Sequence, residues 1–566
     1  MKQEKSLVNN TLSCQILEFC RHIAGSSETT AIAYLDSYSI KGCNERQIQE
    51  VLLIIHDYQP RLMSYIKNVD EKAVFVFAVD QWVFERDIDR GFLGEAIASK
   101  LVFPYLALCG ESYLHQREID LKKRLVLETM ENIALSFPEL ANRILIQPQY
   151  FLYEVLLNRM RVFPLLAYNL PDLMGFLIQN EDSALECYQI ALRQLEREGK
   201  ISYSNGFIVM SKKFVSQCQN PKTRLINLAR NAPRTLFTSF LGIFPQLIKV
   251  VSQNTEAFVN TQRINWRIQS EPTCTFVDPQ KFAFFSTSEG LVSLADKVDI
   301  RGFAQKMLLK DQSADIEIYA IGSMLNDVYL IKARGKNGER KVLAKRFRDW
   351  TGFKWFPLSL WSFGARAFAV ASQDRLSREC VISEVLRQEG FDVPRILHVS
   401  NAERLVFMDF IDGKNLSEAI KRISVTERLD VLDDELAKVR KVGEIYAKVH
   451  ARNITLGDTK PENVLIRKDG KVFLIDFEQA MEGGDKAWDL AVFLYYCGHY
   501  LQPFNSNSNG KAELITRAFI DGYLRGGGDS KVIRKIALTK YTRVFSIFTM
   551  PSTIKAIANV CCDVKG

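Results

Sequence analysis

Histidine is scarce in this sequence, and cysteine never occurs in the close pairs that often bind metals. The 566 residues include 6 histidines and 11 cysteines, which are dispersed except for the adjacent Cys561 and Cys562, and no C-x-x-C pair is present. Structural zinc sites use these residues at short, regular spacings, so the linear sequence gives no sign of one. Scattered cysteines are typical of reduced thiols, which predicts a cytoplasmic protein.

Long apolar runs are lacking as well. No uninterrupted run approaches the length of about 18 residues that a transmembrane helix requires. The nearest candidate, residues 355–372, is broken by Pro357, Gly364 and Arg366. The polar start MKQEKSLVNN has no apolar signal-peptide core behind it. We therefore expect no transmembrane segment.

What is present is typical of a folded chain with several domains. Hydrophobic residues make up 47% and charged residues 25% of the sequence, which does not suit a disordered protein. The length corresponds to roughly three to four domains. A net charge of +8 permits a polyanionic partner without requiring one.

The N-terminal third mixes strand and helix patterns. Residues 1–110 predict an α/β domain, in which the runs 48–55 and 73–79 are rich in Val, Ile and Phe, as in buried strands. Residues 111–182 predict a helical region, because apolar residues recur three and four positions apart.

One weak similarity concerns the start of the chain. Nucleotidyltransferase folds place Gly-Ser ahead of a strand that begins Asp-x-Asp. Here Gly25-Ser26 is followed, after a long gap, by the apolar run at 48–55. The acidic positions are taken by Gln47 and Gln49, whose amides do not hold Mg²⁺ as carboxylates do. A domain of this type would therefore be a degenerate relative.

A helix followed by a hairpin is predicted for residues 183–214. Gly199 ends the helix in the position of a C-terminal cap, and Ser204-Asn205-Gly206 is a hairpin turn signal. The unit resembles a winged helix. Such units bind nucleic acid in some proteins and only separate other domains in others, and both interpretations stay open.

Two basic segments offer surfaces for an anionic partner. Residues 211–255, which lead into a basic helical linker region over 215–315, hold seven Lys/Arg and no Asp or Glu. Residues 340–366 hold seven Lys/Arg, one Asp and several aromatic residues. Both compositions suit a nucleic acid or an anionic membrane surface. Packing of these segments against the protein's own domains is the alternative.

From residue 316 the motifs follow the order of a protein kinase. Residues 316–413 predict an N-lobe that begins with three strands. Gly322 and Ser323 lie in the first turn, where backbone N–H groups can approach phosphate, and Val328 follows on the next strand. Lys345 lies on the third strand among apolar residues, where the phosphates of ATP would supply the anion it needs.

A helix within residues 375–397 offers the acid that would pair with this lysine. Glu379 is our choice, since the eleven residues from it to Gly390 match related kinases, and Glu384 is the competing candidate. The extended linker that follows holds Asp409, Phe410 and Ile411, whose backbone groups would contact adenine. A C-lobe is predicted over 414–566.

The loop GDTKPEN and the strand LIDF bring together the groups that phosphoryl transfer requires. Asp458 could accept the proton of an attacking hydroxyl, and Lys460 could neutralise the transferring group. Asn463, five residues after Asp458, and Asp476, thirteen further, could hold Mg²⁺. The combination is far more specific than any one of these residues.

Asp489 arrives only thirteen residues after Asp476 and opens an apolar helix. We expect it to cap this helix and brace the catalytic loop. The short gap leaves no room for a long activation segment, which favours a self-directed or small-molecule phosphotransfer over peptide docking.

Residues 316–500 resemble atypical protein kinases of the RIO type and the small kinase of the KEOPS complex, through GDTKPEN and LIDFEQA. The resemblance implies an α+β multidomain protein with a C-terminal two-lobed kinase fold and ATP between the lobes. It implies transfer of the ATP γ-phosphoryl to a serine or threonine hydroxyl with Mg²⁺. By resemblance Asp458 is the catalytic base, Asn463 and Asp476 bind the metal, and Lys345 binds phosphate.

Three departures from the family pattern keep an alternative open. Leu456 replaces the loop histidine, Glu478 replaces the glycine after Asp-Phe, and the glycine-rich loop keeps only Gly322. A pseudokinase that binds ATP as a regulatory module, coupled to nucleic-acid or membrane binding by the N-terminal half, is that alternative.

Overall fold

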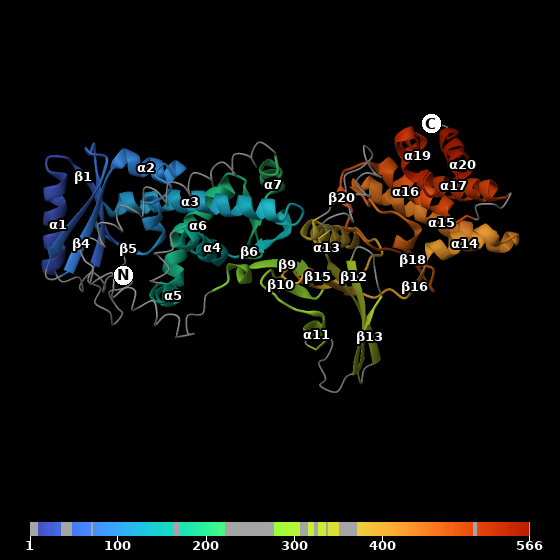
Figure 1. Cartoon of the computed structure of the whole chain (residues 1–566), viewed down its shortest axis with the longest axis horizontal. Helices are drawn as coiled ribbons and strands as arrows, with labels where there is room; N and C mark the ends of the chain where they lie inside the picture. The colour runs from blue at the N-terminus through green and yellow to red at the C-terminus, as the bar shows by residue number, and fades with distance from the viewer. Residues whose placement is uncertain are drawn as a thin grey trace. The chain divides into compact units, whose positions relative to one another are not determined.

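The apolar run at 48–55 forms a central strand of a mixed five-stranded sheet in the computed structural model (Figure 1). The strand order is β3-β4-β2-β1-β5, and only β2 and β4 run parallel. The strands are β1 (Thr29–Leu35), β2 (Ile48–Ile55), β3 (Leu62–Val69), β4 (Lys72–Asp80) and β5 (Tyr105–Cys109). Helix α1 (Asn10–Ala24) lies alongside this sheet and packs Ile16 and Cys20 into its core. The two predicted strands are thus confirmed.

The structure describes residues 10–35, 48–69, 72–162, 170–220, 277–305, 315–321, 326–335, 338–349, 369, 371–501 and 507–564. The chain separates into two compact units, Met1–Phe284 and Phe285–Gly566. The six domain ranges expected from the sequence stay predictions. Gly322, Ser323, Gln47 and most of both basic segments lie outside the described residues.

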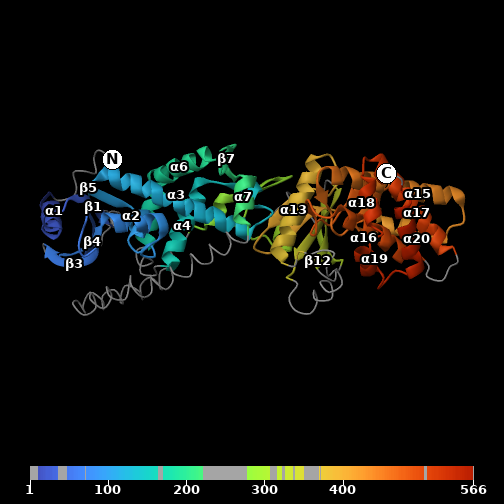
Figure 2. The ribbon, with the colours of Figure 1, turned by 90° about the horizontal axis from the view of Figure 1, so that it is seen from above.

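A helical layer completes the first unit. It contains α2 (Gln81–Arg90), α3 (Glu111–Ser136), α4 (Pro148–Val162), α5 (Leu170–Gln179) and α6 (Glu181–Arg197), with the short elements η3 (Ala98–Val102), η4 (Ala141–Arg143) and β6 (Leu145–Ile146). Helices α3, α4 and α6 pack against one another (Figure 2). The expected helical region is therefore present, with β6 as an interruption.

A tight hairpin follows α6, as its turn residues predict. Gly199, just after the helix, has a left-handed φ of 69°, and the turn residues Asn205 and Gly206 have φ of 49° and 83°. Such angles suit a two-residue turn between paired strands. The hairpin is formed by β7 (Ile201–Ser204) and β8 (Phe207–Met210), and α7 (Lys212–Cys218) follows it.

The second unit contains an antiparallel sheet of order β11-β12-β13-β15-β14. Its strands are β11 (Asp315–Ala320), β12 (Asn326–Gly335), β13 (Gly338–Phe347), β14 (Ile396–Ser400) and β15 (Leu405–Asp409), and α13 (Ser372–Gln388) packs on it. The buried core of the sheet includes Val342, Ala344 and Phe407. The ring of Phe303 stacks on that of Phe407, with 3.9 Å between the ring centroids. Ahead of this sheet in the sequence, η7 (Pro279–Phe282) belongs to the first unit and β9 (Ala283–Thr287) spans the boundary at Phe284. The elements β10 (Gly290–Ser293) and α11 (Ile300–Phe303) follow in the second unit.

Helices form the remainder of the second unit (Figure 1). They are α14 (Leu416–Val425), α15 (Leu429–Ala451), α16 (Lys486–His499), α17 (Ser508–Arg525), α18 (Ser530–Lys535), α19 (Thr539–Phe545) and α20 (Pro551–Cys562). Helices α15 and α17 approach so closely that a Cβ on Gly443 would meet the Phe519 carbonyl oxygen at 2.2 Å. Within the described part of the chain, no helix is both long and apolar enough to cross a membrane.

Small strands shape the loops between these helices. They are β16 (Gly413–Asn415), β17 (Ile454–Thr455), β18 (Val464–Arg467), β19 (Val472–Leu474) and β20 (Met481–Glu482), with η10 (Pro461–Asn463). Strand β18 pairs with β19 and β16, and β17 pairs with β20. The strands β18 and β19 form a hairpin around Gly470, and its second strand ends at Leu474, before Asp476.

Candidate active site

Lys345 extends from β13 into a cluster of three carboxylates. Its Nζ lies 2.6 Å from Asp476 Oδ1, 3.0 Å from Glu379 Oε2 and 3.2 Å from Glu478 Oε2. Burial alone would lower the pKa of Lys345, but the three carboxylates raise it well above its usual value. The lysine is therefore a fixed positive charge.

Of the two acids weighed on the helix, Glu379 is the one that contacts the lysine. It is 2% exposed, and its Oε2 also accepts a hydrogen bond from the Phe477 backbone N–H at 3.1 Å. Burial raises the pKa of Glu379, and Lys345 opposes this rise. Glu384 faces elsewhere and pairs with Arg387 at 2.7 Å. Glu379 therefore links the helix, the strand and the loop after β19.

The backbone angles of Asp476 and Glu478 show why a glutamate is tolerated after Asp-Phe. Its φ is 66°, in the left-handed region, whereas Glu478 is not among the residues with positive φ. Glu478 therefore does not need the conformational freedom of the glycine that it replaces. Burial would raise the pKa of Asp476, but the nearby Lys345 lowers it, so the carboxylate stays charged.

Glu478 belongs to a buried polar network with Arg375 and Asn326. Asn326 Nδ2 donates to Glu478 Oε2 at 2.6 Å, and Arg375 donates to Asn326 Oδ1 at 2.8 Å and to Glu478 Oε1 at 3.4 Å. Arg375 is fully buried. Because Asn326 begins β12, the network connects the start of this strand to the segment after Asp476.

The predicted catalytic loop converges on Asp458. Lys460 Nζ lies 2.8 Å from Asp458 Oδ2, and Asn463 Nδ2 donates to the Asp458 carbonyl at 2.8 Å. Asn463 also accepts a backbone hydrogen bond from Ile475 at 3.0 Å, which ties the loop to the Asp476 segment. Burial would lower the pKa of Lys460, and Asp458 raises it instead. This lysine too is charged at neutral pH.

Asp489 holds the loop through backbone groups. It is fully buried, and its two oxygens accept the N–H groups of Leu456 at 2.6 Å and Gly457 at 2.8 Å. The expectation that Asp489 caps α16 is wrong, because Asp485 is the capping residue and accepts the Ala487 N–H. Asp489 points to the loop from within the first turn.

Leu456 and His450 both contact Asp489 beside the catalytic loop, where the family pattern has a loop histidine. Leu456 is 5% exposed and packs in the helical core, while its backbone N–H binds Asp489. His450, near the end of α15, contacts Asp489 Oδ2 through Nε2 at 3.1 Å and Tyr523 OH through Nδ1 at 2.9 Å. A buried histidine is therefore present beside the loop, six residues before its expected place.

The residues expected to contact adenine lie at the end of β15 and directly after it. Asp409 closes β15, where it pairs with Val342, and its side chain binds Arg395 at 2.6 Å. Phe410 and Ile411 follow and are half-buried. Val328 pairs with Lys345 across β12 and β13, which places it beside the lysine.

Comparison with known proteins gives this arrangement a family. A model of the RIO domain matches residues 368–491, which include Glu379, Asp458 and Asp476. The "Probable serine/threonine-protein kinase BUD32 homolog" of Archaeoglobus fulgidus is 30% identical over 161 residues, which cover 28% of this chain and 71% of that protein. The chain belongs to the RIO and Bud32 family of atypical kinases. It is thus a kinase-like phosphotransferase in its C-terminal part.

Other relatives match shorter fractions of their own length. The "KEOPS complex subunit Bud32" of Pyrococcus abyssi is 31% identical over 105 residues, which are 19% of this chain and 44% of that protein. The "Probable bifunctional tRNA threonylcarbamoyladenosine biosynthesis protein" of Methanocaldococcus jannaschii is 27% identical over 154 residues, 27% of this chain and 25% of that protein. The chain thus spans less than half the length of these two relatives.

Sequence reasoning missed two residues of the site, Arg375 and His450. The role of Arg375 was not foreseen, because its partners Asn326 and Glu478 are 49 and 103 residues away. The contact of His450 with Asp489 was not foreseen either, because 39 residues separate the two. The available signal was the glutamate that directly follows LIDF, because a charged side chain beside a buried strand requires a partner.

Proposed function

We propose that the C-terminal unit binds Mg·ATP and transfers the γ-phosphoryl group to a hydroxyl, with a protein serine or threonine as the favoured acceptor. One observation carries this proposal: Lys345 Nζ lies within 3.0 Å of a carboxylate oxygen of Glu379 and of one of Asp476. Three carboxylates surround one lysine, so the cluster has an excess of negative charge that suits a divalent cation. The sheet and the helical part would form two lobes with ATP between them.

Each residue has a distinct role in the proposed reaction. The acceptor oxygen forms a bond to the γ-phosphorus, the bond from that phosphorus to the bridging oxygen breaks, and ADP leaves. The hydroxyl proton passes to Asp458, and Lys460, 2.8 Å from it, offsets the charge of the transferring group. Asn463 and Asp476 would hold Mg²⁺, which neutralises the phosphates when bound.

The short segment after Asp476 bears on the acceptor. Met481 and Glu482 pair directly with Thr455 and Ile454, next to the catalytic loop. The chain therefore returns to the loop within a few residues and leaves no long activation segment on which a peptide could dock. This supports transfer to the chain itself, to a bound partner or to a small molecule. One relative is named as a subunit of a complex, and we propose that this chain also acts with protein partners.

The test is incubation of the full chain with labelled ATP and Mg²⁺. We expect Asp458→Ala to lower phosphate transfer by about 10²–10⁴-fold while ATP binding largely survives. Asp476→Ala should instead weaken Mg·ATP binding. Glu384→Ala, on the same helix as Glu379 but paired only with its neighbours, is the matched control and should act normally. Normal turnover by both aspartate variants would refute the assignment.

A second candidate function concerns the winged-helix-like unit. A cavity of about 530 Å³ between α6 and the hairpin is lined by Arg193, Arg197 and Tyr203, together with Gln189, Glu196 and Pro148. Two guanidinium groups beside an aromatic ring suit a phosphate backbone with a stacked base. Binding of labelled RNA or DNA, followed by anisotropy at low and high salt, tests this. Arg193→Ala with Arg197→Ala should abolish binding, and unchanged binding would exclude this surface.

A further inference from the structure

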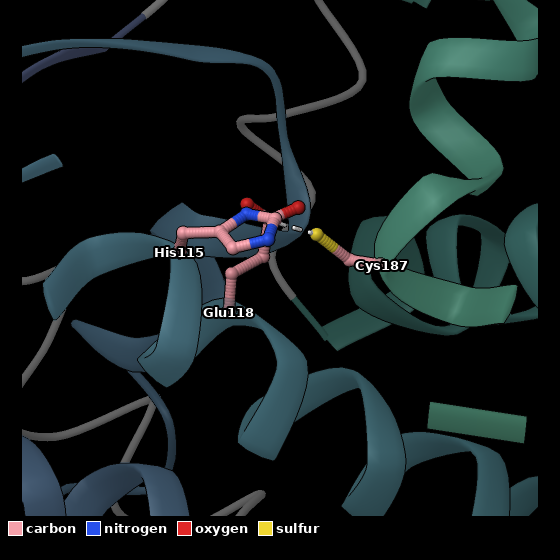
Figure 3. Close-up of side chains that lie close together, drawn as sticks. All are labelled: His115, Glu118 and Cys187. Carbon is pink, nitrogen blue, oxygen red and sulfur yellow. Dashed lines mark hydrogen bonds between the residues drawn. The ribbon is translucent and has the colours of Figure 1, made fainter. Parts of the chain in front are cut away.

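Three metal-binding side chains meet in the first unit, far along the chain from the kinase motifs (Figure 3). They are His115 and Glu118 on α3 and Cys187 on α6. The Cys187 sulfur lies 3.6 Å from His115 Nδ1, and all three ligand atoms lie within 4.8 Å of one another. A nitrogen, an oxygen and a sulfur donor thus face one point.

Helix packing brings these residues together. His115 and Glu118 are three residues apart, so they share one face of α3. That face packs on α6, which presents Cys187 opposite them. Cys187 is 5% exposed and the Glu118 side chain 14%, while His115 is the most accessible of the three. The cluster is therefore anchored in the interior and open on one side.

The spacing suits a four-coordinate metal. Bonds of about 2.0–2.3 Å from a tetrahedral ion place neighbouring ligand atoms about 3.3–3.8 Å apart. The sulfur–nitrogen distance of 3.6 Å already has this value. The 4.8 Å limit for the whole set leaves at most a small side-chain adjustment.

Neighbouring residues orient the carboxylate without occupying it completely. Tyr105 OH donates to Glu118 Oε2 at 2.9 Å, and Lys122 Nζ contacts Oε1 at 2.6 Å. Each carboxylate oxygen has a second lone pair, so a metal can still bind. Such outer contacts are typical of ligating carboxylates. The Lys122 ammonium, 4% exposed, would also stabilise a thiolate nearby.

A reactive thiol is a poorer explanation of the same cluster. Burial is the main cause that raises the pKa of Cys187, to about 12, and Lys122 only partly opposes it. Because Cys187 is also only 5% exposed, a substrate would have little access to its sulfur.

We propose that His115, Glu118 and Cys187 bind one zinc-class divalent ion, with water in the fourth position. A sulfur and an imidazole donor select zinc or cobalt over magnesium. The ion would join α3 to α6. This site is independent of the proposed phosphotransfer, whose residues lie in the other unit.

Cobalt titration of the purified, metal-free full chain tests the proposal. We expect one Co²⁺ per chain, a thiolate-to-cobalt charge-transfer band, the visible bands of a four-coordinate ion, and loss of these bands when Zn²⁺ is added. Cys187→Ser should remove the charge-transfer band. His115→Ala, on the accessible side where folding is least affected, should weaken binding by more than about 10-fold.

Cys109→Ser is the matched control, because Cys109 is an exposed cysteine of the same unit. It should leave both stoichiometry and spectrum unchanged. The proposal is overturned if no band forms in the native chain, if the band survives Cys187→Ser, or if only Cys109→Ser removes it. Circular dichroism of each variant separates loss of a ligand from loss of the fold.

Discussion

At the scale of single residues, Glu478 shows how a departure from a family motif can be stabilising. The side chain is 5% exposed and meets three partners, Lys345, Arg375 and Asn326. Without Glu478, the fully buried Arg375 would lose an acidic partner that lies 3.4 Å from its guanidinium group. A residue that looks like decay in the sequence therefore completes a charge network.

We expect Glu478→Ala to lower the free energy of unfolding by about 3–5 kcal/mol, because it breaks a buried ion pair and leaves a buried cation behind. Chemical denaturation of the second unit measures this. Glu384→Ala removes a partner of Arg387, which is 39% exposed, and should cost no more than about 1 kcal/mol. Equal effects of the two variants would show that the network contributes little.

His398 gives the protein a predictable response to acid. It is 6% exposed, lies beside Phe303 and Phe407, and neither ring nitrogen has a hydrogen-bond partner among the described residues. Burial lowers the pKa of His398 below its usual 6.5, and Asp296 partly opposes this.

The sign of the effect follows from proton linkage. As pH falls below about 6.5, the unfolded chain binds a proton at His398 that the folded chain does not, so stability falls by up to about 1.4 kcal/mol per pH unit. The loss ends below the lowered folded-state pKa. In the His398→Leu variant, the free energy of unfolding should depend less on pH between neutral pH and pH 5 than it does in the native chain. Identical pH profiles would contradict this prediction.

The positions of the proposed site residues were the most accessible part of the site to sequence reasoning, and the contacts that support them were the least. Asp458, Lys460, Asn463 and Asp476 follow from spacing alone, because a loop and a hairpin fix where they meet. The side chain that would replace the loop histidine did not follow. His450 reaches Asp489 only because α15 ends where it does, and a spacing motif does not record that.

At the scale of elements, the approach of α15 to α17 depends on glycine. Gly443 and Gly522 lie where any Cβ would collide with backbone of the other helix, at 2.2 Å and 1.8 Å respectively. The sequence predicted a C-lobe over 414–566 but not the separation of its helices. Local patterns fix an element's type, whereas the distance between two elements depends on both sequences together.

We expect Gly443→Ala to destabilise the second unit by about 1–3 kcal/mol, since backbone must shift to admit the methyl group. Gly175→Ala, in α5 with open space around the new Cβ, is the control for the change of residue type. It should be neutral or slightly stabilising, because alanine is the better helix former. Thermal unfolding of both variants decides the matter; a neutral Gly443→Ala would mean that the helices slide apart without cost.

At the scale of the whole molecule, the chain combines a recognisable kinase unit with a first unit whose function the sequence does not disclose. Strands, hairpins and helices were predictable in both units. The cluster of His115, Glu118 and Cys187 was not, because its members are up to 72 residues apart and no linear spacing connects them. Two regular helices had to be packed before the three side chains became neighbours.

The division into two units also predicts how the full chain unfolds. A ligand that binds only the folded state stabilises it by about 2.7 kcal/mol at a concentration of 100 times its dissociation constant. Mg·ATP at this excess should therefore raise the calorimetric transition of residues 285–566. Asp476→Ala should abolish most of this shift, because it removes a carboxylate on which the excess negative charge around Lys345 depends. A shift of equal size in that variant would place the nucleotide elsewhere in the chain, since binding at the Lys345 cluster requires the charge that Asp476 supplies.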